Sequence, residues 1–117
     1  MNALRTPQAG DELSTPGLQL VSLIRPPSGT TLCVDGEVDL ATVGGLSQAL
    51  HHQLEARPVW SEMVVDLSAV GFISLRGLTA LEAAVARAAD EGIEFHVSGC
   101  PASLVRMLDV LNVELPT

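Results

Sequence analysis

Four consecutive residues, Ser74-Leu75-Arg76-Gly77, stand where an apolar stretch gives way to a helical pattern. The start of a helix presents unpaired backbone N–H groups and the positive end of the helix dipole. A phosphoryl group on Ser74 would be stabilised at such a place, so this serine is a candidate switch. Serine is also a common helix N-cap, and from the residues alone capping is the more expected role of Ser74.

The sequence lacks the motifs that common enzyme classes need for catalysis. A phosphate-binding P-loop needs a lysine after its glycine-rich turn, and the sequence contains no lysine. A receiver domain could use Asp66 as its acceptor, but the late-strand lysine and the paired acidic cluster are missing. No Gly-x-Ser-x-Gly motif is present. We therefore expect no catalytic residue and no cofactor, and we expect Asp66 to hydrogen-bond the turn after its strand.

The histidines and cysteines do not have metal-site spacing. His51 and His52 are neighbours on an expected helix, so their side chains point about 100° apart and cannot chelate one ion. His96 falls in an expected strand, and neither Cys33 nor Cys100 belongs to a zinc motif. We expect structural or surface histidines, no metal, and free buried thiols instead of a disulfide.

Composition limits the function classes further. The chain has 117 residues, of which 47% are hydrophobic and 17% charged, which suits one globular domain. The formal net charge is −8 and all six basic residues are arginines. Such a charge disfavours nucleic acid and anionic lipid as partners. No apolar run is long enough to insert in a membrane, and no signal peptide is evident, so we expect a cytoplasmic protein.

Strand and helix patterns alternate along the chain and must position these residues. Residues 1–16 are expected to form a flexible tail, and residues 17–117 a single domain. The order is strand–strand–helix–strand–helix–strand–helix, which predicts an α/β fold with a mixed, mostly parallel central sheet flanked by helices. The short link after residue 24 predicts an antiparallel hairpin, and Asp35-Gly36 permits a bulge or kink within its second strand. The expected strands are 18–24, 30–40, 62–70 and 93–99, and the expected helices are 41–56, 76–92 and 101–111.

The helices carry apolar stripes and end signals. Their expected buried sides are Val43, Leu46, Leu50 and Leu54 in the first helix, Leu78, Leu81, Val85 and Ala88 or Ala89 in the second, and Leu104, Leu108 and Leu111 in the third. Asp39 or Thr42 is expected to cap the first helix, and Gly92 to end the second.

Three stretches resemble the signatures of STAS domains, in particular those of bacterial anti-sigma factor antagonists. They are GEVDLATVGGL (36–46), VVDLSAVGFISLRGLTAL (64–81) and GIEFHVSGCPASLVRMLDVLNV (92–113), and the resemblance covers roughly residues 18–113. It implies a sheet flanked by helices and no catalytic activity. It also implies a partner, an anti-sigma factor that is a serine kinase (a protein kinase-like ATPase). Binding of that partner frees a sigma factor, and phosphorylation of the antagonist breaks the complex.

The phosphoacceptor of such domains has no counterpart here. The Phe-Ile pair at 72–73 matches the family, the family's aspartate falls on Ser74, and its phosphoacceptor serine falls on Leu75. Arg76 follows, and the family's glycine falls on Gly77. Three consequences stay open at this point: constitutive binding, a displaced acceptor at Ser74, or loss of sigma control with the interaction surface kept.

Two regions are expected to form one partner-binding surface, because the strands before them should be parallel neighbours. The alternative to an anti-sigma factor antagonist is a STAS subunit of a membrane transporter assembly; an enzyme or a nucleotide-binding protein is a further alternative. The predicted partner-binding residues are Asp35, Glu37, Asp39 and Thr42 in the first region and Ser74, Leu75, Arg76 and Gly77 in the second.

Overall fold

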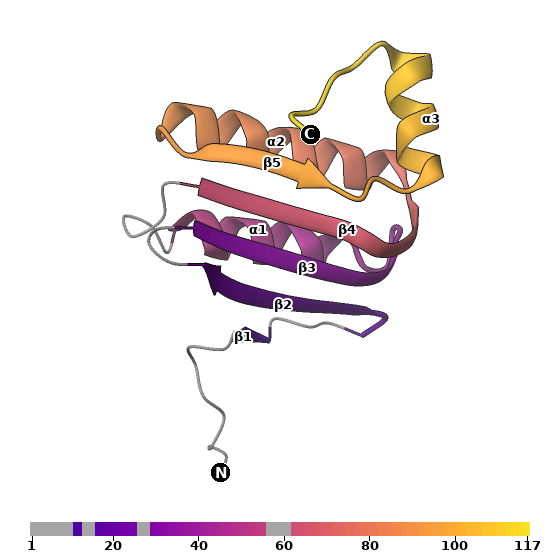
Figure 1. The fold of residues 1–117 in the computed structure, drawn as a ribbon. Coiled ribbons are helices and arrows are strands. Elements are labelled where there is room, and N and C mark those ends of the chain that lie inside the picture. The colour runs from indigo at the N-terminus through magenta and orange to yellow at the C-terminus, as the bar shows by residue number, and fades with distance from the viewer. Residues whose placement is uncertain (1–10, 13–15, 26–28, 56–61) are drawn as a thin grey trace.

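A five-stranded sheet in the order β1-β2-β3-β4-β5 forms the centre of the fold (Figure 1). This computed structural model describes residues 11–12, 16–25, 29–55 and 62–117. Within the described residues, no helix is long and apolar enough to cross a membrane. The strands are β1 (Asp11–Glu12), β2 (Leu18–Arg25), β3 (Gly29–Val38), β4 (Glu62–Ile73) and β5 (Glu94–Ser98), and the helices are α1 (Val43–Glu55), α2 (Leu75–Asp90) and α3 (Ala102–Leu111).

The predicted order of elements from residue 18 onward is confirmed. β2 and β3 form the expected antiparallel hairpin, and β4 and β5 continue the sheet in parallel. The additional strand β1 pairs with β2 through Asp11 and Glu12, inside the range that was predicted to be a flexible tail. Residues 1–10 and 13–15 of that range lie outside the described residues.

The predicted kink at Asp35-Gly36 is confirmed. The pairing of β3 with β4 shifts register between Cys33 and Asp35 and again between Gly36 and Glu37. Gly36 has φ +132°, and a Cβ there would lie 2.7 Å from the carbonyl oxygen of Gly17. A side chain at this position is therefore excluded by both backbone conformation and space.

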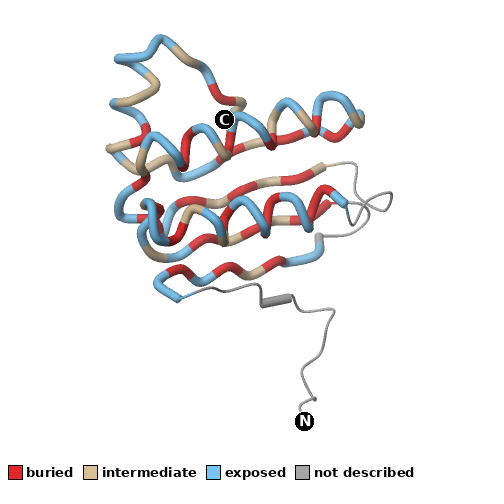
Figure 2. The backbone as a smooth tube through the Cα atoms, turned by 180° about the vertical axis from the view of Figure 1, so that it is seen from behind, coloured by how far each residue is buried: buried red, intermediate tan, exposed pale blue. Residues whose placement is uncertain are grey.

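Helices α1 and α2 cover one face of the sheet, and the buried positions of the helices and of the sheet meet there (Figure 2). The stripes predicted for these helices are confirmed at the positions that are fully buried: Leu46, Leu50 and Leu54 in α1 and Leu78, Leu81 and Ala88 in α2. Val43 and Val85 are partly buried at the edge of the core. The opposite face of the sheet carries no helix among the described residues.

Helix α3 lies beyond the carboxyl end of β4, and here one prediction is wrong. Leu104 is fully buried and Leu108 partly buried, as expected, but Leu111 is 47% exposed. The chain turns back at Asn112 (φ 56°), so that Leu115 reaches the core instead. The carbonyl of Pro116 then accepts a hydrogen bond of 2.7 Å from the N–H of Val97 in β5.

A buried polar cluster joins α1 to the hairpin. The hydroxyls of Ser22 and Thr30 donate to Gln53 Oε1 over 3.0 and 3.1 Å. All three side chains are buried, so each needs these partners to offset its lost hydration. This cluster was not predicted, because its members come from three separate elements.

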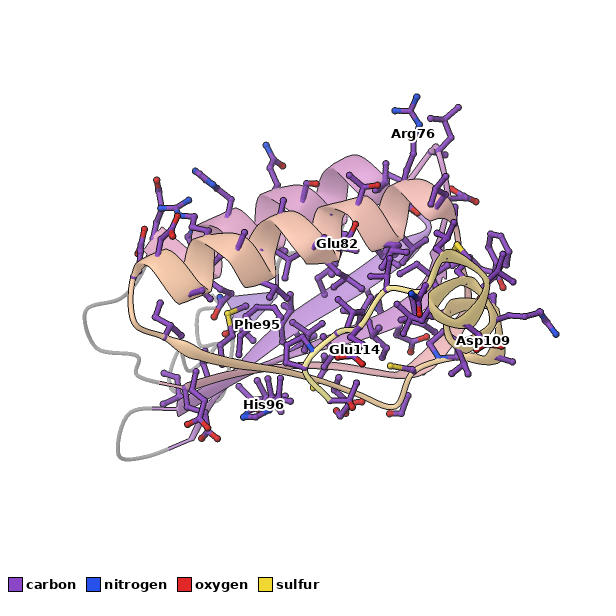
Figure 3. All side chains as sticks on the ribbon, turned by 90° about the horizontal axis from the view of Figure 1, so that it is seen from above. Arg76, Glu82, Phe95, His96, Asp109 and Glu114 are labelled. Atoms are coloured by element: carbon purple, nitrogen blue, oxygen red, sulfur yellow. The ribbon has the colours of Figure 1, made fainter. Side chains whose placement is uncertain are left out.

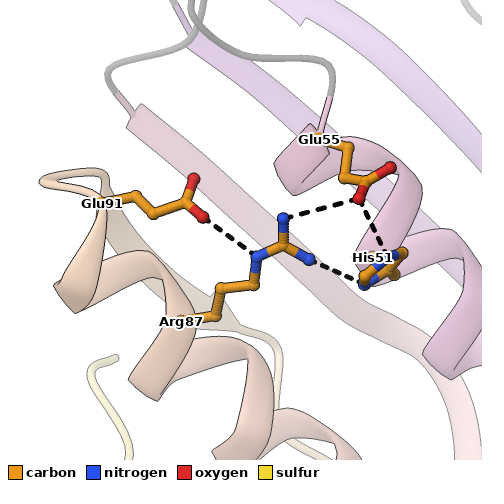
Figure 4. A network of polar contacts seen from close by, with 4 residues as sticks. All are labelled: His51, Glu55, Arg87 and Glu91. Carbon is orange, nitrogen blue, oxygen red and sulfur yellow. Dashed lines mark hydrogen bonds and ion pairs between the residues drawn. The ribbon is translucent and has the colours of Figure 1, made fainter.

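Arg87 links the far ends of α1 and α2 (Figure 4). Its guanidinium donates to His51 Nδ1 over 2.7 Å and lies 3.1 Å from Glu91 and 3.7 Å from Glu55. The Nε2 atom of His51 faces Glu55 at 3.2 Å. His51 therefore has the structural surface role that was predicted for it.

Candidate protein-binding surface

The connections β3–α1 and β4–α2 lie side by side at one end of the sheet. Val38 and Ile73 are paired at the ends of β3 and β4, which run parallel. The next N–H, that of Ser74, donates to the carbonyl of Val38 over 2.8 Å. Because parallel strands end at the same edge, α1 and α2 begin next to each other. The predicted neighbourhood of the two regions is confirmed.

Asp39 and Thr42 cap the start of α1 together. Asp39 Oδ1 accepts hydrogen bonds from the N–H groups of Ala41 and Thr42, at 2.9 and 3.2 Å. The hydroxyl of Thr42 accepts from the N–H of Asp39 at 3.0 Å and donates to the carbonyl of Glu37 at 2.7 Å. Of the two candidate caps, Asp39 is confirmed, because its side chain accepts the N–H groups at the helix start, and Thr42 supports it by accepting the N–H of Asp39.

The second connection is shorter than predicted. β4 extends to Ile73 and α2 begins at Leu75, so the connection expected at residues 71–75 is reduced to Ser74. The Oγ atom of Ser74 accepts a hydrogen bond of 3.3 Å from the N–H of Gly77, which confirms the predicted capping role. Ser74 is thus tied to β3 by its backbone and to α2 by its side chain.

Gly77 is required by close packing of the first turn of α2. The residue is buried, and an added Cβ would collide with Ile73 and would lie 2.8 Å from Cγ1 of Val38. The first turn of α2 therefore rests directly on the ends of β3 and β4. This contact fixes the direction in which Leu75 and Arg76 point.

Leu75 and Arg76 face solvent at the tip of α2. Leu75 is 57% exposed, and Arg76 forms no hydrogen bond or ion pair within the described part of the chain (Figure 3). Neither belongs to the buried residues of α2, which begin at Gly77. A free apolar side chain beside a free cation is a combination that a partner can bind.

The other predicted contact residues differ in how far they are buried. Asp35 and Glu37 are exposed, Asp39 and Ser74 are half-buried, and Thr42 and Gly77 are buried. The two buried residues shape the surface from beneath. Among residues that were not predicted, Leu40 and Phe72 expose large apolar side chains next to the two connections.

Helix α3 adds a second wall that sequence reasoning missed. The hydroxyl of Ser103 accepts a hydrogen bond of 3.0 Å from the N–H of Ile73 and so joins α3 to the end of β4. A groove of about 520 Å³ lies between them, lined by Phe72, Leu75, Arg106, Met107, Val110 and Leu111. The sequence signal for this groove was the apolar pair Val110-Leu111. It was missed because Leu111 was expected to be buried.

On the open face of the sheet, Glu62, Glu94 and His96 place one possible ligand atom each within 4.8 Å of the others. The register that aligns Glu62 with Glu94 brings this group together from two strands, so residue spacing did not reveal it. The Nε2 atom of His96 is 3.4 Å from Glu94. The three side chains are exposed or half-buried, and such groupings are common without an ion.

Cys33 and Cys100 are free thiols, and both are half-buried. Burial, and next the charge of Asp66 on the adjacent strand, raise the pKa of Cys33. Burial also raises the pKa of Cys100. The carboxylate of Asp66 accepts a hydrogen bond of 2.9 Å from the N–H of Ser68, as predicted, although β4 continues beyond it.

A family model described as "Mlab, STAS domain" matches residues 21–115. The chain belongs to the STAS domain family. The resemblance seen in three sequence stretches is thereby confirmed over nearly the whole described chain. No curated protein matches the chain.

Solved structures that are similar to this STAS domain include anti-sigma factor antagonists. One such antagonist, from Mycobacterium paratuberculosis, is 25% identical, with a TM-score of 0.67 over 85% of this chain and 82% of that chain. Another, from Rhodobacter sphaeroides, is 21% identical, with a TM-score of 0.61 over 74% and 90%. A sulfate transporter family protein from Wolinella succinogenes is 17% identical, with a TM-score of 0.61 over 76% and 70%. The last two likenesses establish the fold alone.

Replacement of Gly77 by alanine should destabilise this STAS domain by about 2 kcal/mol, because the added methyl group overpacks the first turn of α2. Gly44→Ala is the matched control: Gly44 lies in α1, and a Cβ there meets nothing within 4 Å. That change should stabilise by about 0.5–1 kcal/mol through helix propensity. Urea unfolding of both variants measures the difference, and equal effects would contradict the packing at Gly77.

Alkylation should reveal the influence of Asp66 on Cys33. Asp66→Asn removes a negative charge that raises the pKa of Cys33, so more thiolate forms at a given pH. Iodoacetamide at about pH 8 should then modify Cys33 about two- to fivefold faster. Cys100 is an internal control, because Asp66 does not influence its pKa. Mass spectrometry resolves the two sites, and an equal acceleration at both would point to loosened structure instead.

Proposed function

We propose that this chain is a non-enzymatic regulatory protein that binds an anti-sigma factor of the serine-kinase type and so relieves inhibition of a sigma factor. The family and the likeness to an anti-sigma factor antagonist support the general kind. The observation that carries the proposal is the exposed Leu75 at the tip of α2, next to the β3–α1 connection. Catalysis is not part of the proposed role.

Binding is constitutive in this proposal. In the family pattern the phosphoacceptor position falls on Leu75, which cannot accept a phosphoryl group. The neighbouring Ser74 already uses its oxygen as the cap of α2. A partner kinase therefore lacks the residue through which it would break the complex, and the leucine supplies apolar contact in the same place.

The partner's complementary surface follows from the exposed side chains. Asp35 and Glu37 are exposed carboxylates in the last part of β3, the strand that leads to the exposed Leu40. A partner patch with an apolar centre and basic groups on one side would match this half of the surface. Buried apolar contact supplies most of the affinity, and the charges set orientation and the rate of encounter.

Leu75→Asp should weaken binding to the anti-sigma factor about 10- to 100-fold, because it places an unpaired charge in the contact. Ala86→Asp is the matched control, since Ala86 is exposed on the same helix but away from the connections. Calorimetric titration against anti-sigma kinases encoded in the same genome gives both affinities. Equal affinity of the two variants would overturn the assigned surface.

Leu75→Ser should restore a phosphorylation switch. With ATP present, the kinase should phosphorylate this variant at residue 75, and the complex should dissociate because two negative charges enter the contact. The native chain should remain unmodified and bound. Phosphate found on Ser74 of the native chain would contradict constitutive binding and show a relocated switch.

A second candidate function is that of a STAS subunit in a membrane transporter assembly. The fold likeness to a sulfate transporter family protein favours it. In such a subunit, a leucine at position 75 does not imply that a phosphoacceptor was lost. Affinity capture of the tagged chain from its native cells distinguishes the two. Recovery of transporter subunits supports the second candidate, and recovery of an ATP-binding anti-sigma kinase supports the first.

A further inference from the structure

The face of the sheet that turns away from α1 and α2, which we call the open face, carries no helix among the described residues (Figure 1). Along the middle of each strand from β2 to β5, buried residues alternate with exposed or half-buried ones. Phe95 of β5 points toward the helices, and its neighbour His96 points the other way (Figure 3). The open face is the set of alternate positions that includes Leu23, Thr31, Val64 and His96, which form one row across four strands.

The centre of the open face is apolar. Val21 and Leu23 of β2 and Val64 of β4 lie on it, with the half-buried Thr31 and Cys33 of β3 between them. The solvated face of a sheet normally carries polar residues, and parallel strands are normally covered on both faces. A contiguous apolar centre on such a face therefore indicates a surface that another molecule covers.

Negative charge borders this apolar centre. Among the described strand residues, the basic positions of the open face are His96, which lies 3.4 Å from Glu94, and Arg25 at the corner of β2. Acidic positions outnumber them and lie toward both ends of the strands. The acidic residues are Asp35, Asp66, Glu62 and Glu94. This excess of carboxylates favours a cationic occupant.

One α-helix has the right width for the apolar centre. Neighbouring strands lie about 4.8 Å apart, so β2, β3 and β4 together span about 10 Å. An α-helix with its side chains is about 10–12 Å across. Packing of helices on the sheet is also how α1 and α2 cover the other face (Figure 2).

We propose that the open face is a second docking surface, which binds a basic amphipathic helix of a protein partner. The apolar stripe of that helix contacts Val21, Leu23 and Val64. Its lysine or arginine side chains pair with Asp66 and Glu94. The open face lies away from the tip of α2, so this inference goes beyond the proposed function and does not rest on it.

Other occupants conflict with the charge or the geometry of the open face. Nucleic acid and anionic membrane surfaces would be repelled by the carboxylates. A second copy packed face to face about a two-fold axis would bring the carboxylates of both copies together. Strand addition needs a free sheet edge, whereas β3 and β4 are each paired on both sides.

The test uses the whole labelled chain and a synthetic amphipathic helical peptide of about 18 residues, built from Leu, Ala and Lys. A matched peptide has Gln in place of Lys and keeps the same apolar stripe. In a titration to about 1 mM, the Lys peptide should shift the amide resonances of Val21, Leu23 and Val64. It should bind at least about tenfold tighter than the Gln peptide. Absence of these shifts, or equal binding of both peptides, would overturn the proposal.

Two neighbouring residues of β2 locate the contact. Leu23 is 39% exposed on the open face, and Ile24, which is 46% exposed, falls on the opposite side of the strand. Leu23→Lys should weaken binding of the Lys peptide at least about tenfold, because it replaces an apolar contact with a charge of the peptide's own sign. Ile24→Lys adds the same charge to the chain and should change the affinity less than about twofold. Equal effects would overturn the assigned face, because they would reflect net charge alone.

Removal of carboxylates tests the charge complementarity. Asp66→Asn with Glu94→Gln should abolish most of the preference for the Lys peptide over the Gln peptide. An asparagine at position 66 can still accept the N–H of Ser68 through its side-chain oxygen. The matched control, Glu82→Gln with Asp90→Asn, removes the same charge from exposed positions of α2 and should leave the preference in place. An equal loss in both double variants would overturn the pairing with Asp66 and Glu94.

Leu75→Asp separates the open face from the surface in the proposed function. This change should alter the affinity for the Lys peptide less than about twofold, because Leu75 lies at the tip of α2. Loss of peptide binding in this variant would overturn the proposal, as would a dimer by light scattering that Leu23→Lys dissociates. If the Lys peptide binds the open face but no anti-sigma factor is captured from cells, this inference stands and the proposed function is wrong.

Discussion

The parallel pairing of β3 with β4 is the constraint on which the candidate surface depends. It ends both strands at the same edge, at the pair Val38 and Ile73, and one hydrogen bond from Ser74 to Val38 continues it into α2. The close contact of Gly77 with these strand ends then fixes the first turn of the helix. The exposure of Leu75 follows from that placement, because the buried positions of α2 begin at Gly77.

Polar groups at this edge are used mainly for structure. Asp39 and Thr42 satisfy each other's backbone, and Ser74 caps α2. Among the described residues, what remains free for a partner is apolar surface, the exposed carboxylates of β3, and the guanidinium groups of Arg76 and Arg106. In the proposed function, this division lets the surface bind a partner by apolar contact without a phosphorylation switch. The scaffold is kept, and Leu75 takes the position that the family pattern gives to a phosphoacceptor serine.

Much of the fold could be predicted from the sequence, because the signals are local. Helical stripes, the Asp35-Gly36 kink and the end of α2 at Gly92 (φ +73°) each depend on residues a few positions apart. Features that depend on distant residues were missed. The pairing of Phe72 with Glu37 lengthened β4 and shortened the expected loop, and the turn at Asn112 sent Leu115 instead of Leu111 into the core. The groove and the group Glu62, Glu94 and His96 are likewise products of tertiary register.

Site-specific photocrosslinking in native cells tests whether the tip of α2 contacts a protein partner. A photoreactive amino acid is placed at position 75 in one version of the chain and at the exposed position 86 of the same helix in another. Position 75 should crosslink to one protein partner, and position 86 should not. A partner that crosslinks from position 86 and not from position 75 would show that the contact lies away from the paired ends of β3 and β4.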